Sequence, residues 1–325
     1  MEQLKAVLNL PEQMKEAMKL KLPELQKKIK KIVIAGMGGS AIGGEILSNW
    51  AMDKTKIPIF INRDYSLPKF VDRETLILAV SYSGNTEETI SSFFDGMRYG
   101  NVIGISSGGI LEKLCKKNVC PHIKLPCGYQ PRAAIGYMLV PELLLLEKIS
   151  IFSAKKEIED AIQLLFNERK NAKKIAMKIS KQIYNSYPVI YAYSPYLPIA
   201  KRWRTQLNEN AKILARDDAF PEMNHNDIVG WSGSDVSNFS AILLRDRDEN
   251  ERIRKRIEIT KEIGFKGAKS IIDVWAKGKS SLSKLIYLLF IGDLTSVYLG
   301  LLRGVDTTKV EVIERLKKEM RKKHT

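Results

Sequence analysis

Short apolar runs alternate with helix-like segments along most of the chain, and this alternation constrains the fold most strongly. In the first half, continuous apolar runs occupy residues 31–35, 58–62, 75–80, 101–105 and 122–125. In the second half, they occupy residues 189–193, 241–244 and 270–274. Continuous apolar strands separated by helices are typical of parallel sheets with both faces covered. We therefore predict an α/β fold with two doubly wound α-β-α sandwich domains and mainly parallel sheets.

The chain has 325 residues, enough for two domains of ordinary size. A long apolar helix is predicted at about residues 135–146, and a charged helical segment at residues 154–181. We place the domain boundary between them, near residues 149–153. This division gives a first domain of residues 1–150 and a second domain of residues 151–325.

The charge of the chain does not point to nucleic acid or to a membrane. The formal net charge is +16, but lysines and arginines are spread over many predicted helices without a DNA- or RNA-binding motif. The apolar run at residues 282–302 contains Lys284 and Asp293. Because charges near the centre of a bilayer are costly, we expect this run to be a buried core helix.

Three cysteines, Cys115, Cys120 and Cys127, lie close together with His122 among them. The N-terminal residues lack the apolar core of a signal peptide. An odd number of cysteines without such a signal is typical of reduced thiols, so we expect a cytoplasmic protein. The cysteine spacing lacks the close Cys-x2-Cys pair of most structural zinc sites, and we expect no metal here.

Two turns rich in glycine and hydroxyl side chains follow predicted strands and open predicted helices. The first is GMGGSAIGG at residues 36–44, and the second is SYSGNTEET at residues 81–89. A strand-to-helix turn presents free backbone N–H groups and the positive end of a helix dipole. Glycines allow close approach of a ligand, and hydroxyls add hydrogen-bond donors. The turns therefore predict a phosphate pocket that uses the hydroxyls of Ser40, Ser81, Ser83 and Thr86.

Other interpretations of these turns remain open. The first turn also fits a dinucleotide fingerprint, Gly36-x-Gly38-x-x-Ala41, with Asp64 as the ribose-binding acid. Either turn could lack a ligand, and Thr86 could serve only as a helix N-cap. The grouping of hydroxyls in the second turn favours a terminal phosphate. The P-loop pattern Gly-x4-Gly-Lys-Ser/Thr does not occur, so we expect the phosphate to belong to the substrate.

Three further segments carry residues suited to carbon chemistry: Arg132 in a QPRAAIG turn, Glu209 in LNEN, and His225 in PEMNHND. Each residue taken alone could be an ordinary surface group. Moving a carbonyl between C1 and C2 of a sugar phosphate requires a base, a cation near the enediolate oxygens and a group that opens the ring. A glutamate, an arginine and a histidine meet these needs without a metal or another cofactor.

The motifs GMGGSAIGG, SYSGNTEET, QPRAAIGYM, LNENAK and PEMNHNDIVGW resemble those of the bifunctional phosphoglucose/phosphomannose isomerases, which are built from two sugar isomerase (SIS) domains. The resemblance runs from about residue 31 to the end of the chain. It implies that Arg132 lies near C1 and C2, that Glu209 is the base and that His225 assists ring opening. It also implies a homodimer in which His225 reaches the partner's site. The implied sugar-phosphate ligands are Gly39, Ser40, Ser81, Ser83 and Thr86.

The family also uses a lysine late in the chain. The ending GVDTTKV…LK resembles its GVDPTPV…LK tail, which assigns Lys317. Lys309 is a rival, because this chain has Thr-Thr-Lys where the family usually has Pro-Thr-Pro.

The expected activity is interconversion of glucose 6-phosphate and mannose 6-phosphate with fructose 6-phosphate through a cis-enediol. An amino-sugar phosphate isomerase or lyase and a non-catalytic sugar-phosphate sensor are the alternatives on the same fold.

Overall fold

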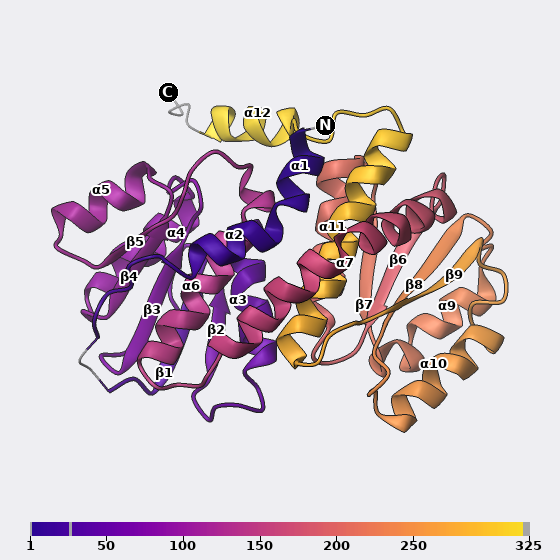
Figure 1. The fold of residues 1–325 in the computed structure, drawn as a ribbon, viewed down its shortest axis with the longest axis horizontal. Coiled ribbons are helices and arrows are strands. Elements are labelled where there is room, and N and C mark those ends of the chain that lie inside the picture. The colour runs from indigo at the N-terminus through magenta and orange to yellow at the C-terminus, as the bar shows by residue number, and fades with distance from the viewer. Residues whose placement is uncertain (1, 26–27, 321–325) are drawn as a thin grey trace.

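The computed structural model describes residues 2–25 and 28–320. Within them, two separate parallel sheets lie side by side, with a layer of helices between them (Figure 1). The first sheet has the strand order β2-β1-β3-β4-β5 and the second has the order β7-β6-β8-β9. Every strand pairing is parallel. The predicted fold class, two doubly wound α/β units, is confirmed.

The strands match the predicted apolar runs closely. The first sheet consists of β1 (Lys31–Ala35), β2 (Ile59–Asn62), β3 (Thr75–Val80), β4 (Val102–Ser106) and β5 (His122–Lys124). The second consists of β6 (Tyr187–Ala192), β7 (Arg216–Ala219), β8 (Phe239–Arg245) and β9 (Ser270–Trp275). The sequence analysis missed only β7, because its residues, RDDA, form a polar edge strand without an apolar run.

The helices of the first half are α1 (Glu2–Leu8), α2 (Leu10–Ala17), α3 (Gly38–Trp50), α4 (Glu87–Met97), α5 (Gly109–Lys117) and α6 (Ile135–Lys148). Those of the second half are α7 (Lys155–Gln182), α8 (Leu197–Gln206), α9 (Asp227–Gly233), α10 (Glu251–Ile263), α11 (Ser281–Leu302) and α12 (Glu311–Met320). Three short turns complete the set: η1 (Pro131–Ala133), the π-helical η2 (Leu207–Ala211) and η3 (Glu222–His225).

The two faces of the first sheet belong to different cores. Alternate residues of β1 and β3, such as Val33 and Ile77, pack with Phe93 of α4 and Leu111 of α5. The other residues of these strands face α3 and α6 and join the core between the two sheets. Because side chains alternate along a strand, one sheet serves both cores.

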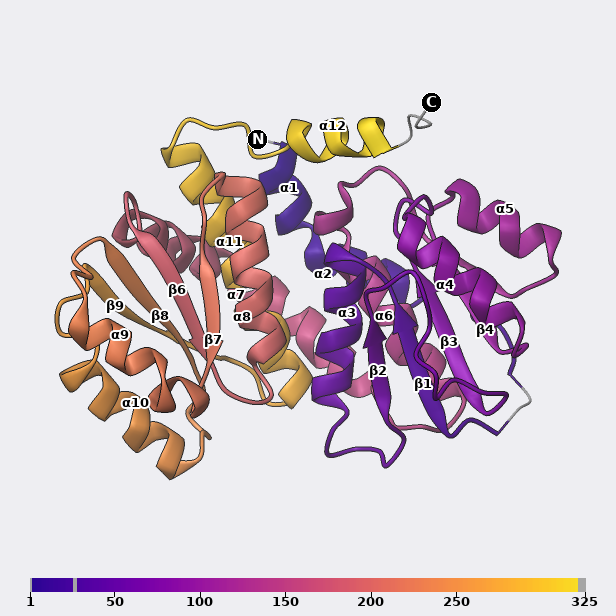
Figure 2. The ribbon, with the colours of Figure 1, turned by 180° about the vertical axis from the view of Figure 1, so that it is seen from behind.

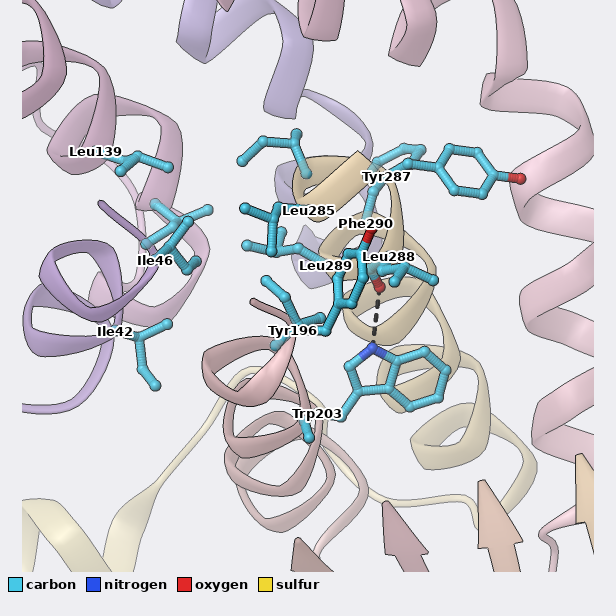
Figure 3. Packing of buried hydrophobic residues seen from close by; sticks show 14 of the residues in the cluster. Ile42, Ile46, Leu139, Tyr196, Trp203, Leu285, Tyr287, Leu288, Leu289 and Phe290 are labelled. Carbon is cyan, nitrogen blue, oxygen red and sulfur yellow. Dashed lines mark hydrogen bonds between the residues drawn. The ribbon is translucent and has the colours of Figure 1, made fainter. Parts of the chain in front are cut away.

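The core between the sheets is built from α3, α6, α8 and α11. Figure 3 shows Ile46 of α3 and Leu139 of α6 facing the apolar residues of α11, with Trp203 of α8 beside them. The indole N–H of Trp203 donates to the carbonyl of Leu288 at 2.9 Å (Figure 3). The two halves of the chain therefore share a continuous apolar core, which holds the first-domain turns in a fixed position relative to α8.

Helix α11 corresponds to the predicted apolar run at residues 282–302. It is the one helix among the described residues that is long and apolar enough to cross a membrane, and 83% of its most apolar window is buried in the protein. Its Asp293 forms a buried ion pair with Arg202 of α8 at 2.7 Å. The prediction of a buried core helix is confirmed.

Candidate active site

The two predicted phosphate turns meet at the carboxyl edge of the first sheet. Strand β1 is followed by α3 and β2 on one side, whereas β3 is followed by α4 and β4 on the other. The edge between β1 and β3 is thus the point where the strand order reverses, and ligands of open α/β sheets bind at such points. A Cβ atom placed at Gly36 would lie 2.9 Å from the carbonyl oxygen of Val80, so the first turn begins against the end of β3, where the second turn starts.

Both helices that begin at these turns have N-termini without a side-chain cap. The N-cap residues are Met37 for α3 and Thr86 for α4, and neither side chain accepts a helix N–H. The hydroxyl of Thr86 is instead 2.8 Å from that of Ser81. The first N–H groups of α3 and α4 are therefore free of side-chain acceptors, which leaves them available to an anion.

The second turn is tightly folded. The Ser81 hydroxyl accepts from the N–H of Gly84 at 3.1 Å, and Gly84 has a φ of 69°. A Cβ atom at Gly84 would lie 1.8 Å from the Gly108 carbonyl oxygen, so only glycine fits at this point. Ser83 is partly exposed and accepts weakly from the N–H of Asn85. Of the predicted hydroxyl groups in this turn, those of Ser83 and Thr86 belong to partly exposed residues, whereas Ser81 is buried.

The first turn lies directly against the turn that carries Arg132. A Cβ atom at Gly39 would lie 3.2 Å from the Pro131 carbonyl oxygen and 3.5 Å from the Cα of Arg132. The hydroxyl of Ser40 donates a hydrogen bond to the sulfur of Met138 at 3.2 Å. The absence of a side chain at Gly39 thus allows the N-terminus of α3 to reach Arg132.

Arg132 is buried, and its guanidinium joins three parts of the chain. Its Nε donates to Oδ1 of Asn210 at 2.8 Å. One terminal nitrogen donates to the carbonyls of Thr307 and Thr308 at 2.8 and 2.7 Å. The other terminal nitrogen lies 3.8 Å from the carboxylate of Glu209. Burial lowers the pKa of Arg132, and Glu209 and Asp306 oppose this shift.

Glu209 lies on η2, a single π-helical turn that continues from α8. Its side chain is 30% exposed and lines a cavity of about 710 Å³ together with Lys212, Asp306 and Lys309. Single π-helical turns often occur at functional sites. The sequence analysis identified Glu209 from the LNEN motif but did not predict the π-helical form of this turn.

A buried hydrogen-bond network holds the backbone carbonyl of Arg132. The carbonyl of Arg132 accepts from Arg202 at 2.8 Å and from Gln206 at 3.1 Å. Asn210 donates to Gln206 at 2.8 Å and to Ser296 at 2.9 Å. The sequence analysis did not identify these supporting residues, although Asn210 lies within the quoted motif LNENAK.

His225 does not reach Glu209 within the same chain. Glu209 precedes β7 and His225 follows it, and a four-residue strand spans about 13 Å. Figure 2 shows α9, which begins just after His225, far from α12 and from the end of α8. His225 is exposed. The structure therefore groups Gly39, Arg132 and Glu209, but places His225 elsewhere.

The two candidate lysines differ in position. Lys309 lines the cavity beside Glu209. Lys317 lies on α12, beyond the residues of that helix that line the cavity, and is exposed. Among the described residues, no group of three or more His, Cys, Asp or Glu side chains is arranged to hold a metal ion.

These features define an α/β protein with two parallel sheets and a candidate site where the first glycine-rich turn meets Arg132, beside Glu209. A family model for the bacterial phospho-glucose isomerase C-terminal SIS domain matches residues 169–320. The C-terminal domain of glucosamine-fructose-6-phosphate aminotransferase from Francisella tularensis has the same fold, with a TM-score of 0.73, 17% identity and coverage of 94% of this chain and 98% of that one.

Closer relatives specify the family. The bifunctional phosphoglucose/phosphomannose isomerase of Caldicellulosiruptor bescii is 37% identical over 97% of this chain and 98% of its own length. The D-glucosamine-6-phosphate 4-epimerase of Sulfolobus acidocaldarius is 32% identical over 67% of this chain and 69% of its own length. The chain belongs to the bifunctional phosphoglucose/phosphomannose isomerase family, which confirms the resemblance seen in its motifs.

Proposed function

We propose that this protein interconverts glucose 6-phosphate and mannose 6-phosphate with fructose 6-phosphate, through a cis-enediol intermediate and in the cytoplasm. The observation that carries the proposal is the pairing of Glu209 with one terminal nitrogen of Arg132, next to the N-terminus of α3. Family membership supports the substrate class.

The phosphate group of the sugar is assigned to the free N-termini of α3 and α4, with Gly39, Ser40, Ser81, Ser83 and Thr86 around it. Phosphate binding far from the reacting carbons orients the substrate without taking part in bond breaking. Glu209 removes the proton at C2 of the aldose and returns it at C1, while the hydroxyl proton on O2 passes to O1; the reverse reaction follows the opposite course. Arg132 stabilises the enediolate oxygens with the nitrogen that faces Glu209.

The first experiment incubates pure protein with fructose 6-phosphate, with and without EDTA, and separates the aldose products. Formation of both glucose 6-phosphate and mannose 6-phosphate, unaffected by EDTA, is the expected result. Formation of neither product would refute the proposed activity.

Glu209→Gln tests the assignment of the base. The loss of general-base catalysis should lower kcat by about 10²- to 10⁴-fold, with little change in substrate binding. Glu311→Gln is a matched control, because Glu311 lines the same cavity from α12. Normal turnover by Glu209→Gln would show that another group is the base.

We further propose a homodimer in which the partner's His225 completes the site. The separation of Glu209 and His225 by β7 supports this arrangement. Inactive Glu209→Gln and inactive His225→Ala proteins can be mixed, dissociated and reassociated. A mixed dimer then has one site with both native groups if His225 acts across the interface. Recovered activity is expected, whereas its absence with mixed dimers present would place the two groups in the same chain.

Lys309 is the better placed of the two candidate lysines, because it lines the cavity beside Glu209. Lys309→Met should therefore reduce turnover more than Lys317→Met. The opposite order would support the motif-based assignment of Lys317.

An amino-sugar phosphate is the second candidate substrate, and the D-glucosamine-6-phosphate 4-epimerase relative favours testing it. Incubation with glucosamine 6-phosphate, followed by separation of the sugar phosphates, distinguishes the two. Conversion of glucosamine 6-phosphate without conversion of fructose 6-phosphate would select this alternative.

A further inference from the structure

Lys212 connects the turn that carries Glu209 with the C-terminal segment at residues 306–309. It directly follows η2 and has a φ of 56°, a left-handed conformation that residues with a Cβ rarely adopt. Its ammonium donates to the carbonyl of Glu209 and, at 2.6 Å, to the carbonyl of Lys309. A glycine would adopt this backbone more easily, but it could form neither contact.

Two cations hold three consecutive carbonyls of the C-terminal segment. Arg132 binds the carbonyls of Thr307 and Thr308, and Lys212 binds that of Lys309. Asp306 closes the segment on itself, because its Oδ1 accepts from the N–H groups of Thr308 and Lys309 at 2.7 and 3.2 Å. The C-terminal segment is therefore hydrogen-bonded both to Arg132 and to Lys212, which follows the Glu209 turn.

The contact with Lys212 also compensates for the end of the helix. A helix leaves its last carbonyls without intrahelical donors. The Glu209 carbonyl lies in this position, because the chain leaves the helix at Lys212. Burial and the nearby charge of Arg132 lower the pKa of Lys212, as expected for an ammonium held close to the site.

We propose that Lys212 is a positioning residue for the isomerase reaction, which fixes the Glu209 turn and the C-terminal segment relative to Arg132. This inference rests on the proposed role of Glu209 as the base. Lys212 does not exchange a proton with the sugar. It keeps the carboxylate of Glu209 at the distance and angle that proton transfer requires.

The test compares three substitutions at this position. Lys212→Gly relieves the backbone and removes the ammonium, whereas Lys212→Met retains the backbone conformation and also removes the ammonium. Both should lower kcat at least tenfold and change KM less than threefold. Lys212→Arg retains a cation that can reach both carbonyls and should restore most of kcat. Val119→Gly is the matched control, because Val119 is exposed and has a φ of 54°.

Hydrogen exchange gives a second measurement that does not depend on turnover. The amides of Thr308 and Lys309 should exchange faster in Lys212→Gly and Lys212→Met than in the native protein, while the amides of the first sheet stay unchanged. Native kcat in folded Lys212→Met, measured well below its unfolding temperature, would overturn the proposal. If Glu209→Gln is inactive in the same assay, that outcome overturns the role of Lys212 alone. Full activity of Glu209→Gln would overturn the base assignment itself.

Discussion

Glu142 makes the stability of this protein depend on pH in a way that one substitution can reveal. It is completely buried on α6, and neither carboxyl oxygen has a hydrogen-bond partner among the described residues. A Cβ atom at Gly43 of α3 would lie 3.8 Å from its Oε1, so α3 covers the carboxyl group. Burial raises the pKa of Glu142 well above its usual value of 4.5.

Because the pKa of Glu142 is raised in the folded protein, the free energy of unfolding falls as the pH rises above 4.5. Above pH 4.5 the unfolded chain releases the proton of Glu142, whereas the folded protein retains it. Each further pH unit then lowers the free energy of unfolding by about 1.4 kcal/mol, until the carboxyl group of the folded protein also ionises. Glu142→Gln removes this dependence. Its stability relative to the native protein should therefore rise by about 2.7 kcal/mol between pH 5 and pH 7 while the native carboxyl stays protonated.

Urea unfolding at pH 5, 6 and 7 measures this difference directly, with both proteins followed by circular dichroism. Glu24→Gln is the control, because the side chain of Glu24 is 80% exposed. The free energy of unfolding of Glu24→Gln should change with pH in the same way as that of the native protein between pH 5 and pH 7. A constant difference between Glu142→Gln and the native protein would show that the carboxyl group is ionised in both states and would refute the reasoning.

Three other substitutions test the contacts of the site and its support. Gly39→Val should raise KM for fructose 6-phosphate more than tenfold in steady-state assays, because its side chain would press the N-terminus of α3 away from the Arg132 turn; an unchanged KM would contradict the phosphate assignment. Arg132→Lys keeps the charge but cannot span the three carbonyl oxygens of Asn210, Thr307 and Thr308, and kcat/KM should fall by about 10²-fold; activity near the native level would argue against this role. Asp293→Asn leaves the buried guanidinium of Arg202 without its carboxylate partner, and should lower the free energy of unfolding by about 3–5 kcal/mol in urea titrations. A loss below 1 kcal/mol would mean that the ion pair contributes little to stability.

The central elements of the fold could be predicted because each carries its own local signal. Strands β1 and β3 are continuous apolar runs that become fully or nearly fully buried, and their ends match the prediction. The glycine-rich turns follow directly from these strands. Helix α5 was not predicted, because its short sequence GILEKLCKK has only two buried residues. The hydrophobic pattern of the sequence therefore predicts an element least reliably when that element buries few side chains.

Parts of the site were also visible in the sequence. Arg132, Glu209 and the first turn were identified from their motifs, and the structure brings them together. The contacts that orient them were not visible, because they join distant parts of the chain. The carbonyls that Arg132 binds are 175 and 176 residues away.

The sequence by itself determined the α/β class, the position of both turns and the residue types available for the chemistry, because these depend on local hydrophobic periodicity and on the backbone preferences of neighbouring residues. Only the tertiary structure decided which groups meet. It separated His225 from Glu209 by the length of β7, gave Glu209 a π-helical turn and placed Lys212 between that turn and the C-terminal segment. These outcomes depend on how α8, α11 and the chain end pack across the shared core, and packing between distant segments leaves no periodic signal in the sequence.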